Sequence, residues 1–238
     1  MRAESSGTPC PFRSAHEPPS PLANYLVVDL FFISCATTSE FPLFGHAPGR
    51  HYRDVAIGES AGDRMTNGNL LLASLDEALA QGERLLQSLS DRQYAAKLPE
   101  ADASIGAHYR HSLEHFQLMF EAVQQPGIDY DSRARDGALE NERLLALSLT
   151  RDFRHAARFL SPAQLERAIE AHCQTSYNDG APSTAASTFG REVMYAVSHA
   201  IHHYALIALI CRLRKIPLPQ NFGMAPSTLR YQRQSASA

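Results

Sequence analysis

Hydrophobic residues recur at helical spacing once the chain has passed Met65. Between Asn67 and Leu89, leucines and alanines return every three or four positions with charged residues between them, which predicts an amphipathic helix. The same reasoning predicts three further helices, at residues Ser104–Pro126, Leu139–Phe159 and Phe189–Arg214. Ser104 is the expected N-cap of the second, and Pro126 must end it.

Two short segments before the last predicted helix have the character of strands. Ile169–Tyr177 and Ser183–Thr188 flank Asn178-Asp-Gly-Ala-Pro182, a turn signal that predicts a hairpin. The last helix is apolar almost all round and should therefore be central. Together these patterns predict an all-α fold, an up-and-down four-helix bundle with a small β-hairpin insert before the last helix.

Residues 1–64 lack this order. They contain the proline-rich run Pro18–Pro21, and their one apolar segment, Tyr25–Ala36, is interrupted by Asp29 and shorter than the roughly 20 residues of a membrane span. We interpret residues 1–64 as a disordered or non-native extension that precedes a start at Met65. The alternative is a targeting role. The expected organisation is an extension at 1–64, the helical bundle at 65–230 and a flexible tail at 231–238.

Composition and charge exclude several function classes. The formal net charge is -3 and 20% of residues are charged, so the basic stripe that a nucleic-acid partner requires is missing. No P-loop, GxSxG elbow or glycine-rich dinucleotide loop occurs in the sequence. The four cysteines are scattered without a CxxC pair, at Cys10, Cys35, Cys173 and Cys211, and this pattern indicates a reducing, cytoplasmic location. No membrane association is expected.

Histidine is the residue type that suggests chemistry. Six of the eleven lie in two helices, His108, His111 and His115 on the second and His199, His202 and His203 on the last. His199 and His203 are four residues apart, so their imidazoles stack on one face and can bind one metal ion. A third imidazole from the second helix would complete a set that leaves a coordination position open, as in catalytic sites. The spacing alone does not choose among His108, His111 and His115.

Two alternatives concern the glutamates near these histidines. Without a metal, the imidazoles would be core groups that hydrogen-bond to backbone carbonyls, Glu114 or Glu192. Glu192 lies seven residues before His199 on the same face, and it is the candidate catalytic residue. It could act as a base, orient a ligand imidazole, or interact with the helix N-terminus.

These segments resemble the DinB/YfiT-like superfamily. The likeness rests on Ser104-Ile-Gly-Ala-His-Tyr-Arg-His-Ser-Leu-Glu-His-Phe116, Gly190-Arg-Glu-Val193 and Ser198-His-Ala-Ile-His-His-Tyr204, and it extends over Asn67–Leu229. That family is a four-helix bundle, often dimeric, with one histidine ligand on the second helix and an HxxxH pair on the last. The resemblance implies the ligands His111, His199 and His203, because the first family ligand follows a helix-opening serine by about seven residues.

The family includes thiol-dependent transferases and isomerases that use bacillithiol or mycothiol, and metal hydrolases. We therefore expect a metal-dependent enzyme of the hydrolase or thiol-transferase type, in which Zn²⁺, Ni²⁺ or Fe²⁺ lowers the pKa of a bound water or thiol. Its expected partners are a small-molecule substrate, a low-molecular-weight thiol and a second copy in a homodimer. The alternative is a non-catalytic bundle that binds a metal or small molecule. In family members the last helix usually continues as HHxGQ, whereas in this chain Tyr204-Ala205-Leu206 follows the histidine pair. This difference leaves the substrate open.

Overall fold

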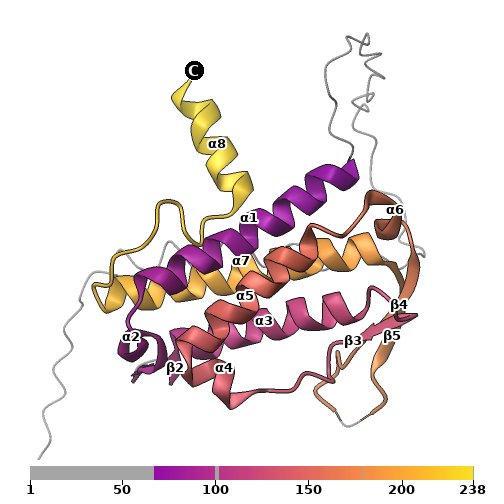
Figure 1. The fold of residues 1–238 in the computed structure, drawn as a ribbon, viewed down its shortest axis with the longest axis horizontal. Coiled ribbons are helices and arrows are strands. Elements are labelled where there is room, and N and C mark those ends of the chain that lie inside the picture. Colours follow the sequence, from indigo (N-terminus) through magenta and orange to yellow (C-terminus); the bar gives the residue numbers. More distant parts are fainter. Residues whose placement is uncertain (1–66, 100–101, 179, 238) are drawn as a thin grey trace, which may run out of the picture. The chain divides into compact units, whose positions relative to one another are not determined.

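The computed structural model describes residues 67–99, 102–178 and 180–237, and the extension expected at 1–64 lies outside them. Four long helices dominate this part of the chain (Figure 1): α1 (Asn67–Ser88), α3 (Ile105–Glu121), α5 (Arg143–Ala157) and α7 (Phe189–Leu213). Each corresponds to a helix predicted from the hydrophobic spacing. The predicted third helix is divided, because the extended backbone of Glu142 separates the short α4 (Gly137–Asn141) from α5.

Side-chain caps fix the start of the two helices that carry the histidines. The Ser104 hydroxyl accepts a hydrogen bond from the backbone N–H of Ala107 at 2.9 Å, which confirms the predicted N-cap of α3. Thr188 accepts one from the N–H of Arg191 and begins α7 in the same way. Such caps satisfy backbone donors that have no partner within the helix.

Short elements connect the long helices. The remaining helices are α2 (Asp91–Ala95), α6 (Pro162–Leu165) and α8 (Pro226–Ala236), and the strands are β1 (Lys97–Leu98), β2 (Ala103–Ser104), β3 (Gly127–Asp129), β4 (Ala168–Cys173) and β5 (Ser183–Thr188). The predicted hairpin is present as antiparallel β4 and β5. A strand that we did not predict, β3, pairs in parallel with β4. Residues expected to form a flexible tail are helical in α8 as far as Ala236.

Helices α1 and α5 pack side by side in opposite directions. At one end, the Arg143 guanidinium at the start of α5 donates to the carbonyl of Leu86 near the end of α1, at 2.8 Å. At the other, Arg154 near the end of α5 pairs with Asp76 near the start of α1, at 3.0 Å. The two contacts lie in reversed order along the two helices, so α1 and α5 are antiparallel.

Helices α3 and α5, in contrast, run in the same direction (Figure 1). Gly106 at the start of α3 lies against the carbonyl of Glu140, just before α5, and the rings of Phe120 and Phe153 stack at 5.1 Å near the two C-terminal ends. The up-and-down order expected from the sequence is therefore wrong. That expectation assumed short links. The connection through β3 and α4 is long enough to return along the bundle before α5 begins.

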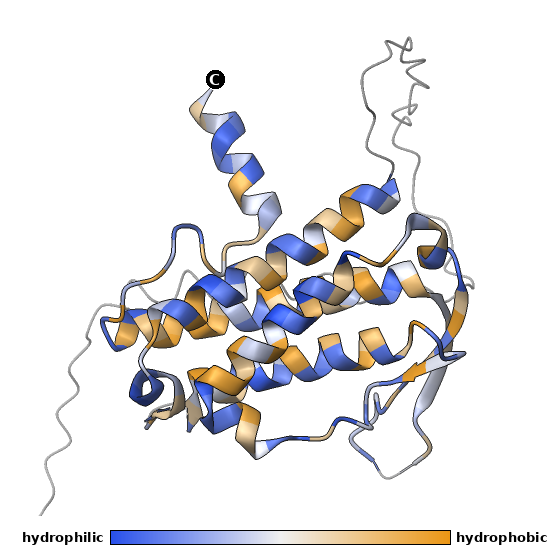
Figure 2. Ribbon diagram, viewed as in Figure 1, coloured by the Kyte–Doolittle hydropathy of each residue, from blue (hydrophilic) through white to orange (hydrophobic). Residues whose placement is uncertain are grey.

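Helix α7 packs against both α1 and α3. Tyr204 of α7 stacks on Tyr109 of α3 at 6.0 Å between ring centroids, and both rings are fully buried. Figure 2 shows hydrophobic and hydrophilic bands along the long helices, as expected of helices with one buried side. Among the described helices, only α7 has the length and hydropathy of a membrane span. In its most apolar stretch of 18 residues, 44% of the residues are buried inside the bundle, and the core helix of a soluble protein can have the same length and hydropathy.

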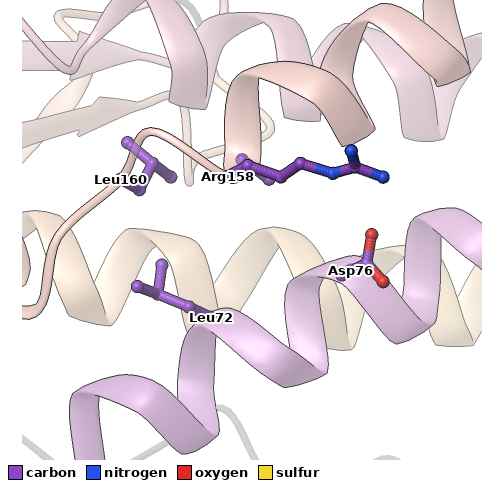
Figure 3. A pocket seen from close by; sticks show the side chains of 5 residues that line it. Leu72, Asp76, Arg158 and Leu160 are labelled. Atoms are coloured by element: carbon purple, nitrogen blue, oxygen red, sulfur yellow. The ribbon is translucent and has the colours of Figure 1, made fainter.

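A surface depression of about 220 Å³ lies between α1 and the end of α5 (Figure 3). It is lined by aliphatic and charged side chains, Leu72, Asp76, Ala157, Arg158 and Leu160. Asp76 is already paired with Arg154. None of the lining residues is one of the six clustered histidines, so we assign this depression no role in the chemistry.

Candidate metal centre

The antiparallel packing of α3 and α7 brings three predicted ligands together. His111 of α3 and His199 and His203 of α7 each offer a ring nitrogen, and these three atoms all lie within 4.8 Å of one another. The closest contact joins Nε2 of His111 to Nε2 of His199 at 2.9 Å. The rings of His199 and His203 are 4.6 Å apart, as expected one helical turn from each other.

The geometry and the chemistry of this group both fit a metal ion. Two nitrogens bound to one tetrahedral zinc ion lie about 3.4 Å apart, given a Zn–N distance of about 2.0–2.1 Å. Small rotations of the rings, together with release of the Arg133 guanidinium that now contacts His111, would bring all three nitrogens to one ion. Burial is the main reason that the pKa of His111 and of His199 falls to about 3 and that of His203 to about 2, and neighbouring imidazoles add to the effect. The rings are thus neutral at pH 7, as metal ligands must be.

The other two histidines of α3 flank this group. Nδ1 of His108 lies 3.1 Å from Nδ1 of His203, so His108 contacts a candidate ligand. Nδ1 of His115 donates to the carbonyl oxygen of His111 at 2.9 Å, and its ring lies 4.1 Å from that of His199. The structure therefore places His111 in the group, with His108 and His115 beside it. The remaining histidine of the two clusters, His202, is exposed.

Glu192 is fully buried but does not hydrogen-bond to any histidine among the described residues. Its carboxylate accepts hydrogen bonds from the hydroxyls of Tyr130 and Ser187, and Arg191 pairs with it at 3.0 Å. The Tyr130 ring in turn stacks on that of His115 at 5.6 Å. Glu192 thus holds Tyr130 against the histidine group, and its catalytic role stays a prediction.

The second glutamate near the histidines is also occupied elsewhere. Glu114 is 2% exposed and accepts hydrogen bonds from the Arg110 guanidinium and from the backbone N–H of Asp136. The alternative in which Glu114 and Glu192 satisfy the imidazoles is therefore not supported by the hydrogen bonds of the described residues. The imidazoles contact each other, backbone and one arginine instead.

That arginine is Arg133, a residue that the sequence analysis missed. Its Nη1 lies 2.6 Å from Nδ1 of His111 and 3.3 Å from Nε2 of the same ring. Arg133 belongs to the connection between β3 and α4, which the sequence identifies only as polar. No local signal distinguishes it from its neighbours. Only the course of this connection back along the bundle brings it beside α3.

Comparison with known proteins gives one family and a few distant relatives. The family model of the DinB superfamily matches residues 74–207, more than half of the chain and all three grouped histidines. The FK506-binding protein 5 of Rhizopus delemar is 34% identical over 104 residues, which cover 44% of this chain. The match spans only 27% of that fungal protein.

Two solved structures from Bacillus subtilis are similar at low identity. A DinB-like protein, YjoA, is 18% identical, with a TM-score of 0.48, and the match covers 66% of this chain and 100% of that one. The second, YfiT, is described as a probable metal-dependent hydrolase with an unusual four-helix bundle topology. It is 12% identical, also with a TM-score of 0.48, and the match covers 68% of this chain and 95% of YfiT. At these scores neither structure bears on the activity of this chain. The family match over most of the helical bundle is decisive by itself: the chain belongs to the DinB superfamily.

Proposed function

We propose that the protein is a metal-dependent enzyme of the hydrolase or thiol-transferase type, with one divalent transition-metal ion bound by His111, His199 and His203. The observation that carries this proposal is the meeting of three neutral ring nitrogens from two helices within 4.8 Å. Three protein ligands leave at least one coordination position for a substrate, as in catalytic sites. A bound ion would supply Lewis acidity that lowers the pKa of a coordinated water or thiol.

The residues around the histidines would orient these ligands and shield them from water. His108 contacts Nδ1 of His203, and such contacts fix the ring orientation of a metal ligand. The Tyr195 ring stacks on that of His199 at 5.5 Å. Tyr130 meets Tyr195 edge to face at 4.9 Å, and its hydroxyl is held by Glu192. Burial, and then the Glu192 carboxylate, raise the pKa of Tyr130, so its hydroxyl stays protonated.

Imidazole ligands do not select among Zn²⁺, Ni²⁺ and Fe²⁺. We further propose a small-molecule substrate and a cytoplasmic location, because neither the charge nor the cysteine pattern favours nucleic acid or an oxidising compartment. Low-molecular-weight thiols remain part of this proposal, as co-substrates of a transferase.

The first test is the metal content of the full chain purified without a histidine tag. We expect about one ion per chain in the wild type, loss of the ion in His203→Ala, and no loss in His202→Ala, a matched control because His202 is the exposed neighbour. A chain that cannot be loaded with Zn²⁺, Ni²⁺ or Fe²⁺ would refute the proposal. Unchanged content in His203→Ala would refute the ligand assignment.

The second test separates an enzyme from a non-catalytic binding protein. Metal-loaded wild type, metal-free wild type and His203→Ala are assayed with activated esters and with pairs of an electrophile and a thiol. Turnover that requires both the ion and His203 supports an enzyme. An ion that is bound without any turnover in either reaction class would favour the non-catalytic alternative.

A further inference from the structure

Arg133 lies beside the histidine group and forms no ion pair with a carboxylate among the described residues. Its only hydrogen bonds in the described part of the chain go to His111, and its Nε is buried without a partner. The other two arginines near the site are paired, Arg110 with Glu114 and Arg191 with Glu192. A half-buried guanidinium without a paired anion costs free energy, and a bound anion would offset this cost.

The contact between Arg133 and His111 fixes where the His111 proton lies. A guanidinium only donates hydrogen bonds, and the shorter of its two contacts, 2.6 Å to Nδ1 against 3.3 Å to Nε2, assigns the acceptor role to Nδ1 of His111. In the neutral ring the proton is then on Nε2, which faces Nε2 of His199 at 2.9 Å and donates to it. This arrangement is self-consistent as long as no ion is bound.

A metal ion on His111 is incompatible with that contact. If Nε2 binds the ion, the remaining ring proton moves to Nδ1, which can no longer accept a hydrogen bond from Arg133. If Nδ1 binds the ion instead, the ion takes the lone pair that Arg133 now uses. In both cases a bound ion would release the guanidinium, which lies beside the three histidines.

We propose that the released Arg133 binds a carboxylate group of the substrate. The inference rests on the proposed function, and it narrows the substrate to a small molecule that carries a carboxylate near its reacting group. A guanidinium fork matches the two oxygens of a carboxylate.

Two aspartates share this region with Arg133 but do not pair with it. Asp129 and Asp131 both raise the pKa of the Cys173 thiol, after burial, while Arg133 lowers it. Their carboxylates accept backbone N–H groups, from Asp131 and Gln174 respectively. The guanidinium therefore keeps its donors for one small anion, and the comparison of acetate with inorganic phosphate tests which anion it prefers.

The test uses the full chain loaded with Co²⁺, whose visible spectrum reports ligands that bind at or beside the ion. Acetate and inorganic phosphate are titrated into the wild type, Arg133→Gln, Arg133→Lys and Arg135→Gln. We expect Arg133→Gln to weaken acetate binding about tenfold or more, the loss typical of a hydrogen bond to a charged group. Arg133→Lys keeps the charge without the fork and should show an intermediate loss. Arg135→Gln, in the same connection but exposed, should leave the affinity unchanged.

A second readout separates anion binding from a structural role. Because Arg133→Gln removes a cation that competes for His111, it should bind Co²⁺ at least as tightly as the wild type. A weaker Co²⁺ affinity would show that Arg133 supports the site itself and would overturn the inference. Equal acetate affinity in wild type and Arg133→Gln, or a larger effect on phosphate than on acetate, would also overturn it. Failure of the wild type to bind Co²⁺ would instead refute the proposed function.

Discussion

Replacing the three histidines of α3 one at a time by alanine should give three clearly different losses of metal affinity. His111 shares the group with the pair on α7, His108 contacts His203, and His115 contacts backbone and ring faces. Since all three lie on one helix within two turns, they are matched in backbone setting. The series therefore tests the geometry rather than the presence of histidine.

The expected magnitudes follow from these contacts. A four-ligand structural zinc site is worth about 10–16 kcal/mol, or about 3 kcal/mol per ligand, so loss of the His111 ring should weaken binding by roughly 100-fold or more. His108 hydrogen-bonds to a candidate ligand at 3.1 Å, and removal of such a partner costs about 10- to 100-fold. His115 hydrogen-bonds to the backbone carbonyl of His111 and not to a ligand nitrogen, and its ring packing on His199 is worth about 0.5–1.5 kcal/mol, or about tenfold.

The assay is competition for Zn²⁺ against a chromophoric chelator at pH 7.5, with circular dichroism to verify the fold of each variant. His155→Ala is the control, because His155 is exposed on α5 and its ring contacts Phe159. A larger loss for His115→Ala than for His111→Ala would show that the ligand on α3 is misassigned. Small and equal losses in all three variants would refute a three-histidine site altogether.

Four further predictions concern stability, pH, the buried carboxylate and the N-terminal region. Gly106→Ala should lower the unfolding free energy by about 1–3 kcal/mol, since the new methyl group would clash with a backbone carbonyl of α4. In Gly137→Ala the methyl group would meet nothing within 4 Å, so thermal melts of this control should be close to those of the wild type. The metal-free protein should lose stability as the pH falls from about 6.5 toward 3, because the pKa values of the grouped histidines are lower in the folded protein than in the unfolded chain, which then binds more protons. Urea unfolding between pH 7.5 and 5 checks this prediction. A variant with all three histidines replaced by asparagine should show a weaker dependence of stability on pH. Glu192→Gln should keep its metal but unfold about 1–3 kcal/mol more easily, because the amide replaces one of the two acceptor oxygens by an NH2 donor that faces a hydroxyl and an arginine. A variant of wild-type stability that loses only turnover would favour a catalytic base. A chain that starts at Met65 should fold and bind metal like the full chain, and its aggregation would show that the preceding residues belong to the fold.

The secondary structure and the choice of candidate chemistry were accessible from sequence. Hydrophobic spacing located the four long helices to within a few residues, Ser104 marked the start of α3, and the turn between β4 and β5 was recognisable. The i, i+4 spacing of His199 and His203 also placed them on one face. All of these properties depend on residues close together in the chain, where backbone geometry alone fixes which side chains are neighbours.

Only the tertiary structure decided how these pieces meet. The parallel course of α3 and α5 depends on the path of a long connection, and no periodicity encodes such a path. That path also brings Arg133 to His111, from 22 residues away in sequence, and the packing of α3 on α7 decides that His111 joins the pair while His108 and His115 flank it. Contacts between distant segments arise from the burial of whole helix faces against one another, so the local pattern limits the candidate residues and the packing selects among them.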